Sequence, residues 1–142
     1  DYKFKWTNDI YLDDKKLCGI LVEKTKDFFI IGIGININNS DFGYAQDRAI
    51  SLKNKTGNFY RIEDIIFCII NEFKRYFSED WSFVLKEINS YNYLKDKEIE
   101  IVKYGESLGV GVAKDIAEDG RLIVEIDGQE KLFNIGEIHI RK

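Results

Sequence analysis

The hydrophobic pattern of this chain changes from a helical period to a period of two near Tyr93, and this change indicates a two-part architecture. Between Ile62 and Phe77, apolar residues recur at steps of three and four, as an amphipathic helix requires. After Tyr93, apolar residues alternate with polar or small ones, as in β-strands. Three turn signals separate these runs: Tyr104-Gly105, Asp119-Gly120 and Asp127-Gly128. We therefore predict an α+β protein with a helix-covered sheet domain over residues 1–93 and a small β-barrel over residues 94–142.

The sheet of the first part is expected from two neighbouring strand-like runs, Leu17 to Glu23 and Phe28 to Asn38. The second run is apolar on both faces, which predicts a strand in the middle of a covered, mixed sheet. Its glycines, Gly32 and Gly34, weaken a strand but let a backbone or ligand approach closely. We expect the helix that begins at Ile62 to cover this sheet.

A second helix is expected from about Glu79 to Tyr91, with Ser78 as N-cap and acidic residues in the first turn. Its inward-facing residues would be Trp81, Val84, Leu85 and Ile88. The roughly forty residues that follow the polar stretch 89–97 contain five strand-like runs, and this number fits a Src-homology-3-like barrel.

Composition limits the classes of function. The chain has 142 residues, of which 44% are hydrophobic, so it can bury a core. A net charge of -4 gives no support for a nucleic-acid or anionic-membrane surface, and there is no apolar run of 18 residues. Cys18 and Cys68 lie in apolar runs without metal-ligand spacing, so we expect reduced core residues and a cytoplasmic protein. Because the chain opens with Asp1 and not with Met, we expect it to be a piece of a longer protein.

Two segments are candidates for chemistry. Lys5 to Lys16 combines Trp, Asn, Asp and several lysines before a strand, although a solvated charged loop explains such a segment equally well. Asn36 and Asn38 end the apolar strand, where asparagine either begins a turn or contacts a ligand at the strand end.

Taken together and in this order, the motifs of the chain resemble those of biotin protein ligases. Residues 5–11, KWTNDIY, resemble the family motif KWPND(L/I), and residues 16–23, KLCGILVE, resemble K(L/V)-x-GIL(V/I)E. Residues 32–38, GIGININ, are similar to the family's GIGINVN strand, and residues 49–52, AISL, to a later A-T-S-L segment. Residues 136–141, GEIHIR, match the GEI-x-x-R ending of the family's barrel. These matches cover almost the entire chain.

This resemblance implies an enzyme that joins biotin to ATP with Mg²⁺, forming biotinyl-5′-adenylate, and then transfers biotin to a lysine of a carboxylase carrier domain. A fixed cation near the reacting phosphate would stabilise the charge of the transition state. Lys16 matches the family's catalytic lysine, whereas its neighbour Lys15 should point to the opposite face of the strand. Asp9 matches the family's aspartate, which would either orient Lys16 or take part in magnesium binding.

The resemblance also implies a nucleotide site. Asn8 and Asn36 match positions near the adenine, whose edge an amide can recognise because it both donates and accepts hydrogen bonds. Phe42 matches an aromatic that stacks on the base, although an anchor of its own loop explains Phe42 equally well. The backbone at Gly19, Gly32 and Gly34 would lie next to the ligand.

At the end of the chain, Glu137 and Arg141 carry the family's barrel motif. The resemblance implies that they contact the catalytic domain near the nucleotide or the acceptor protein, and an interdomain salt bridge is the alternative. We expect His139 between them to be exposed and without a catalytic role, because histidine needs a placed partner to act as an acid or base.

The chain departs from the family pattern in three places. Thr7 stands where the family has proline, so the turn before Asn8 loses a fixed φ, and Cys18 replaces a small residue. The glycine- and arginine-rich segment that grips the biotin carboxyl group and the phosphates has no counterpart. We therefore expect this piece to be inactive, or nearly so, by itself.

Other functions stay open at this point. A carrier-recognition or dimerisation module predicts binding to an apo carrier domain without nucleotide, and a homodimer through exposed sheet edges is possible. A lipoate-handling acyltransferase with the same catalytic fold is a further alternative. We expect no DNA binding through this piece.

Overall fold

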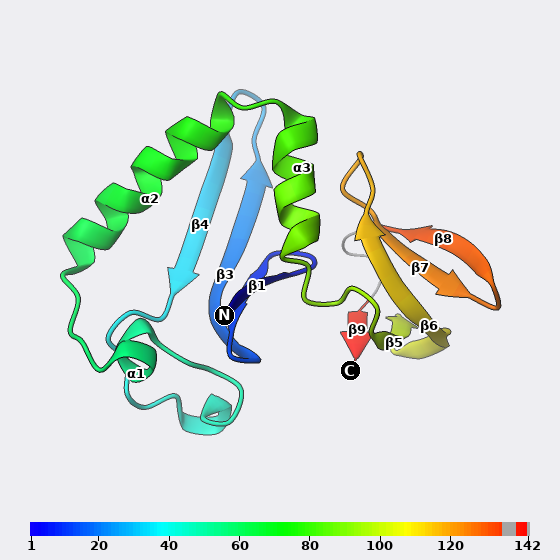
Figure 1. The fold of residues 1–142 in the computed structure, drawn as a ribbon, viewed down its shortest axis with the longest axis horizontal. Coiled ribbons are helices and arrows are strands. Elements are labelled where there is room, and N and C mark those ends of the chain that lie inside the picture. The colour runs from blue at the N-terminus through cyan, green and yellow to red at the C-terminus, as the bar shows by residue number, and fades with distance from the viewer. Residues whose placement is uncertain (135–138, 142) are drawn as a thin grey trace. The chain divides into compact units, whose positions relative to one another are not determined.

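The computed structural model describes residues 1–134 and 139–141, which fold into two compact units, Asp1–Glu79 and Asp80–Lys142. Each unit contains one antiparallel sheet and at least one helix (Figure 1). The predicted α+β class is therefore confirmed.

The first unit is built on a four-stranded sheet in the order β1-β2-β3-β4 (Figure 1). Its strands are β1 (Tyr2–Lys5), β2 (Asp9–Leu12), β3 (Lys15–Lys24) and β4 (Phe29–Ile35), and each neighbouring pair is antiparallel. The only parallel pairing among the described residues of this unit is an isolated bridge between Lys16 and Ala49. The two strand-like runs are confirmed, but the prediction that the second lies in the middle of the sheet is wrong, because β4 lies at its edge.

A small core supports this sheet on one face. Leu12, Leu17 and Cys18 are buried there, and Ile50 and Leu52 pack against them from the segment that follows β4. Leu52 also begins the short helix α1 (Leu52–Thr56).

A side-chain cap begins helix α1, and a glycine in the left-handed conformation ends it. The hydroxyl of buried Ser51 accepts a hydrogen bond from the backbone N–H of Asn54, which caps the first turn. Gly57 ends the helix in the left-handed conformation, at φ 75°, that glycine adopts without strain. A 3₁₀ turn, η1 (Gly43–Ala45), precedes α1.

Helix α2 spans Ile62–Phe77, as the hydrophobic period predicts. It runs alongside β4 in Figure 1, but the expectation that it covers the sheet is wrong, since no residue of α2 is buried. An open groove of about 570 Å³ lies between the isoleucines of β4 and those of α2. Both cysteines are free, as expected, but Cys68 on α2 is exposed, so only Cys18 is a core residue.

Helix α3 (Trp81–Ser90) begins two residues later than predicted. The carboxylate of Asp80, and not Ser78, caps it by accepting a hydrogen bond from the backbone N–H of Ser82. The indole N–H of Trp81 donates to the carbonyl of Glu118 at 2.8 Å, and Trp81 is 50% exposed where we expected it to face inward. By its contacts α3 belongs to the second unit, and the domain boundary between residues 93 and 94 stays a prediction.

The second unit contains the five strands that the sequence predicts, in the order β8-β7-β6-β5-β9. They are β5 (Glu98–Lys103), β6 (Glu106–Ile116), β7 (Leu122–Ile126), β8 (Gln129–Phe133) and β9 (His139–Arg141), and all described pairs are antiparallel. The pairings run from β8 to β9 without a described pairing between these two outer strands, so closure of the barrel is not part of the described structure.

Two predicted turns of this sheet have the backbone that their residues favour. Tyr104 and Gly105 have φ values of 52° and 88°, and Asp127 and Gly128 have values of 53° and 73°. Two consecutive positive φ values are typical of the tight turn that matches the twist of a β-hairpin.

The second unit has a fully buried apolar core. Five large apolar side chains on or beside its strands are at most 1% exposed: Leu94, Ile99, Ile101, Leu122 and Val124. Among the described residues, no helix is long and apolar enough to cross a membrane.

Candidate functional site

The first unit carries an ion pair where the sequence places its candidate catalytic residues. The Nζ atom of Lys16 on β3 lies 2.6 Å from Oδ1 of Asp9 on β2. A register shift between Ile10 and Tyr11 places Asp9 opposite Gly19 and Tyr11 opposite Lys16. About half of the Lys16 side chain is exposed, so its ammonium group can still reach a ligand.

Gly19 makes room for this ion pair. A Cβ atom at Gly19 would lie 3.2 Å from Nζ of Lys16 and 3.3 Å from Oδ1 of Asp9, closer than ordinary packing allows. Gly19 also pairs with Gly34 on β4. A Cβ atom at Gly34 would meet only the carbonyl of Gly19, at 3.8 Å, so no side chain covers the backbone here. The ion pair therefore lies over Gly19 and next to the uncovered backbone of Gly34, and the place of these glycines beside a ligand stays a prediction.

The same face of the sheet carries a second lysine. Residues directly opposite each other in a sheet share a face, and Lys5 on β1 lies opposite Asp9. Its Nζ atom donates a hydrogen bond to the Tyr11 hydroxyl at 3.2 Å and lies 4.9 Å from the centre of the Tyr11 ring. We call the surface formed by Lys5, Asp9, Tyr11, Lys16 and Gly19 the lysine face.

Lys5 and Tyr11 were not predicted as site residues from the sequence. Both belong to the motif that identified Asp9, so the signal was available. What was missing is the pairing of β1 with β2, which brings the first residue of the motif back beside Asp9. Lys16 forms the ion pair with Asp9, and the expectation that Lys15 points to the opposite face stays a prediction.

Asn8 and Asn36 both hold the backbone around this face. The Asn8 side-chain amide donates to the carbonyl of Ile20, and the N–H of Ile20 donates to the Asn8 carbonyl at 2.8 Å. The Asn36 amide nitrogen lies 3.4 Å from the carbonyl of Lys16. These contacts join neighbouring segments of the sheet and do not form a turn, and the adenine-binding role of both residues stays a prediction.

The remaining candidate site residues are distant in sequence from Asp9 and Lys16. Phe42 is half-buried at the start of the 3₁₀ turn, where its backbone N–H donates to the Gln46 side chain at 3.1 Å. Its stacking role also stays a prediction. Arg141 lies in β9, opposite Glu100, and Glu137 lies outside the described residues.

Cys18 points to the face opposite the ion pair, where it belongs to the core. Burial raises the pKa of its thiol, and the nearby Asp9 carboxylate raises it further while Lys16 lowers it. A thiol with a raised pKa carries little thiolate at neutral pH, so Cys18 is not a candidate nucleophile.

Within residues 1–134 and 139–141, no three His, Cys, Asp or Glu side chains gather to hold a metal ion. Asp9 is therefore the one carboxylate of the lysine face available to a cation. A magnesium ion usually keeps several waters and needs only one or two carboxylates when it arrives with phosphates, so the donor set fits an ion carried by a nucleotide.

Comparison with known proteins agrees with this geometry. The family model described as "Biotin/lipoate A/B protein ligase family" matches residues 1–38, which include the lysine face. The model described as "Biotin protein ligase C terminal domain" matches residues 96–141, which include all five strands of the second sheet.

Relatives match almost the full chain. The "Bifunctional ligase/repressor BirA" of Escherichia coli is 28% identical over 153 residues, covering 98% of this chain and 46% of its own length. The "Biotin--[acetyl-CoA-carboxylase] ligase" of Mycobacterium tuberculosis is 22% identical and covers 96% of this chain and 53% of its own length. The chain thus spans about half the length of the curated relatives it matches.

Solved structures have the same fold. The Aquifex aeolicus biotin protein ligase in complex with biotin and ATP has a TM-score of 0.84 and 25% identity, covering 99% of this chain and 62% of the other. The Leishmania major enzyme in complex with biotinyl-5-AMP has a TM-score of 0.59 at 22% identity and supports the fold alone.

Fold and comparisons together define an α+β unit of the biotin protein ligase fold and a small β-sheet unit. The motifs, both family models and the relatives identify the family, and the chain belongs to the biotin protein ligases.

Proposed function

We propose that this chain is the carboxyl-terminal part of an enzyme that forms biotinyl-5′-AMP from biotin and ATP and transfers biotin to a lysine of a carrier domain. The observation that supports the proposal is the ion pair of Lys16 and Asp9, which lies over Gly19 and next to the uncovered backbone of Gly34. It combines a fixed cation with a surface that a flat ligand can approach.

In the first step, an oxygen of the biotin carboxylate attacks the α-phosphorus of ATP, and pyrophosphate leaves. Both reactants are anionic, so charge builds up on the phosphate oxygens in the transition state. The Lys16 ammonium stabilises this charge, and Asp9 holds the ammonium in place through the 2.6 Å contact. Magnesium, when bound to the nucleotide, neutralises part of the phosphate charge.

In the second step, the amine of the carrier lysine attacks the carbonyl carbon of the mixed anhydride, loses a proton, and AMP leaves. We propose that Lys5 and Lys16 keep the negatively charged AMP on the lysine face until this step. Asn8, Asn36 and Phe42 are the proposed contacts of the adenine, and Glu137 and Arg141 of the acceptor or the neighbouring domain. Two free cysteines suit the reducing cytoplasm, where we place the enzyme.

The test is ATP- and biotin-dependent labelling of an apo biotin carrier domain by the full-length protein. We expect Lys16→Ala to lower the rate of labelling about 10²–10³-fold, as for loss of one transition-state donor. Lys15→Ala is the matched control, because it removes the same charge from the adjacent residue of the same strand, and it should leave the rate unchanged. Equal effects of both substitutions, or no labelling at all by the unchanged protein, would overturn the proposal.

Lys16→Arg sharpens the same test. Arginine keeps the charge but presents it as a planar fork on a longer side chain, so it cannot reproduce a point contact with Asp9. We expect Lys16→Arg to stay well below the unchanged enzyme in rate. Full activity of this variant would mean that charge near the sheet suffices and that the position of the ammonium group does not matter.

The isolated chain gives a separate result. Because the chain has no glycine- and arginine-rich segment, we expect no measurable biotinyl-adenylate synthesis by it alone. Binding of an apo carrier domain without nucleotide would instead favour the carrier-recognition alternative.

A further inference from the structure

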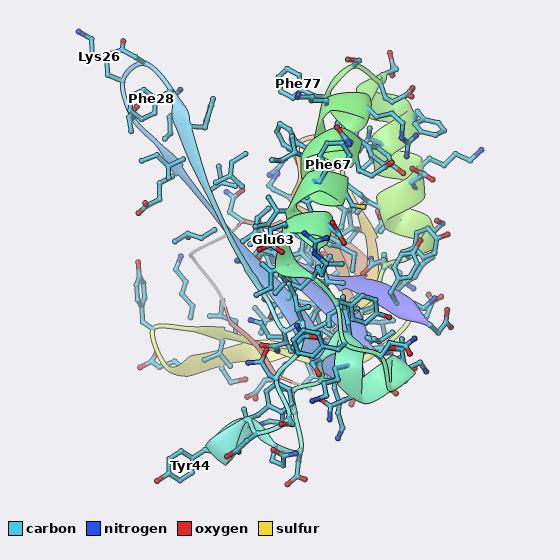
Figure 2. All side chains as sticks on the ribbon, turned by 90° about the vertical axis from the view of Figure 1, so that its left-hand side faces the viewer. Lys26, Phe28, Tyr44, Glu63, Phe67 and Phe77 are labelled. Carbon is cyan, nitrogen blue, oxygen red and sulfur yellow. The ribbon has the colours of Figure 1, made fainter. Side chains whose placement is uncertain are left out.

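Tyr11 on β2 differs from the exposed aromatic side chains of the first unit. Tyr44 on η1 and Phe67 and Phe77 on α2 are each at least 68% exposed (Figure 2). Tyr11 is only partly exposed and belongs to the lysine face, where its hydroxyl and its ring both contact one ammonium group. The catalytic steps proposed above give Tyr11 no role, although it is held inside the site that performs them.

The ammonium group that Tyr11 contacts is that of Lys5 on β1. The Lys5 Nζ atom donates a hydrogen bond to the Tyr11 hydroxyl at 3.2 Å and lies 4.9 Å from the centre of the ring. A cation within about 6 Å of an aromatic ring is attracted to the negative face of the ring. An ammonium group has three N–H donors, and the bond to Tyr11 uses one of them. Tyr11 therefore fixes the position of the Lys5 charge and leaves donors for a ligand.

The two ammonium groups of the lysine face differ in how their charge is compensated. The Lys16 ammonium lies 2.6 Å from the carboxylate of Asp9, so the charges of this pair largely cancel. Lys5 forms no ion pair among the described residues, and a phenol hydroxyl is neutral at pH 7. Lys5 is therefore the residue of the lysine face whose positive charge no carboxylate of that face neutralises.

The intermediate of the proposed reaction has a charge that fits Lys5. After pyrophosphate has left, the phosphate of biotinyl-5′-AMP keeps one negative charge. A lysine side chain that is already ordered loses less conformational entropy on binding this anion than a freely rotating one. An ammonium group held by Tyr11 can thus bind the adenylate more tightly than an unheld lysine would.

We propose that Tyr11 is a positioning residue, which holds the Lys5 ammonium group against the phosphate of biotinyl-5′-AMP and so slows the release of this intermediate before the carrier lysine attacks it. Lys16 and Asp9 then serve the formation of the adenylate, whereas Lys5 and Tyr11 serve its retention. This assignment rests on the proposed function, because that function supplies the intermediate.

The experiment measures how fast added, labelled biotinyl-5′-AMP leaves the full-length protein when an excess of the unlabelled compound is present. Tyr11→Phe removes the hydroxyl and keeps the ring, Tyr11→Leu removes both, and Lys5→Met removes the charge at a similar side-chain length. We expect release to be about three- to tenfold faster for Tyr11→Phe, as for the loss of one hydrogen bond. Release should be at least about tenfold faster for Tyr11→Leu and Lys5→Met, which lose the ring contact or the charge itself.

A double variant separates positioning from support of the fold. If Tyr11 acts through Lys5, adding Tyr11→Phe to the Lys5→Met protein has no further effect on release. A further acceleration would mean that Tyr11 acts on the ligand or on the fold directly, and the proposal would be wrong. Pyrophosphate formation at saturating ATP should change by less than about twofold in Tyr11→Phe, since Lys16 and Asp9 are intact.

Two matched controls test the lysine and the tyrosine separately. Lys3→Met removes the same charge from the same strand, at the residue opposite Tyr11. Tyr104→Phe removes a hydroxyl from a tyrosine whose ring also lies near a lysine, with Nζ of Lys103 at 5.6 Å, but which is 91% exposed in the second unit. Both controls should leave release unchanged. Equal effects of Lys3→Met and Lys5→Met, equal effects of the two tyrosine variants, or unchanged release in Tyr11→Phe would each overturn the proposal.

The two proposals can fail separately, because binding of added biotinyl-5′-AMP requires no catalysis. If Tyr11→Phe speeds release while Lys16→Ala labels the carrier at the full rate, only the proposed role of Lys16 is wrong. If Lys16→Ala abolishes labelling while Tyr11→Phe leaves release unchanged, only the role of Tyr11 is wrong.

Discussion

The two sheets of this chain differ in where their apolar side chains lie. In the second unit, Leu122 and Val124 are 0% exposed, and the sheet encloses its own core. In the first unit, the best-buried residues of the sheet core, such as Cys18, are still 6–8% exposed, while Ile31 and Ile33 on β4 are 42% exposed. Among the described residues, the core of the second unit is therefore more fully buried than that of the first, and the first unit exposes the apolar residues of β4.

The first sheet carries the proposed nucleotide site, beside the uncovered backbone of Gly34, and the apolar groove between β4 and α2. In the second unit, exposed apolar side chains such as Leu108, Val110 and Leu132 surround a core that is fully buried. Matched positions in the two units test this comparison.

The largest expected effect comes from the buried core of the second sheet. Leu122→Ala should lower the free energy of unfolding by about 2–5 kcal/mol, because it removes buried methyl groups and leaves a cavity. Leu21→Ala, on the first sheet, should change it by less than about 0.5 kcal/mol, because Leu21 is 60% exposed. Urea unfolding followed by circular dichroism measures both. A large loss for Leu21→Ala would show that the first sheet is covered in solution and would break the comparison.

One helix and two turns were predictable from the sequence because each depends on residues that are close together in the chain. The bounds of α2, Ile62–Phe77, follow from a period of 3.6 residues that the chain displays directly. The turns at Tyr104 and Asp127 follow from residues that tolerate a positive φ before glycine.

What was not predictable depends on pairing between distant segments. An apolar run on both faces shows that β4 needs cover, but it does not show whether the cover belongs to the same chain. The ion pair between Asp9 and Lys16 depends on a register shift in β2 that no residue pattern announces. Lys5 was missed for the same reason, since only strand pairing brings it beside Asp9.

A pair of glycines tests how tightly each sheet is packed. A Cβ atom at Gly111 on β6 would lie 2.6 Å from the carbonyl oxygen of Glu125, whereas at Gly32 on β4 it would meet nothing closer than 3.8 Å. Gly111→Ala should therefore cost up to about 3 kcal/mol through overpacking, and Gly32→Ala should cost little stability. Thermal unfolding of both variants measures this difference. If Gly111→Ala is neutral, β6 and β7 are less tightly packed than the structure shows.

Two asparagines, one in each unit, should contribute similarly to the free energy of unfolding. Asn38 exchanges two hydrogen bonds with the backbone of Tyr60, at 2.8 and 3.0 Å, and Asn89 does the same with Ile116, at 3.0 and 2.7 Å. Both asparagines are partly buried, so water can replace some of the hydrogen bonds that their substitution removes. We expect Asn38→Ala and Asn89→Ala each to cost about 1 kcal/mol, at the low end for unpaired backbone groups.

Urea unfolding checks this pair, with Asn58→Ala on the exposed surface as the control. If only Asn89→Ala destabilises the chain, the first unit does not contribute to cooperative unfolding. That outcome would sharpen the contrast between the two units beyond what burial alone implies.

The smallest effect concerns α3 and depends on pH. The side chain and backbone of Ser82 donate hydrogen bonds to Asp80, at 2.6 and 2.8 Å, and these bonds lower the pKa of the Asp80 carboxyl group below 3.8. The stability from this cap is therefore fully present above pH 3.8 and is lost as the pH falls through the lower pKa of the folded state. Asp80→Ala should lower the melting temperature slightly at pH 7, and the difference from the unchanged chain should narrow near pH 3. Asp80→Asn keeps a capping oxygen that does not titrate, so it should retain its cap at both pH values. A pH-independent deficit of Asp80→Ala would mean that the charge of Asp80 does not stabilise α3.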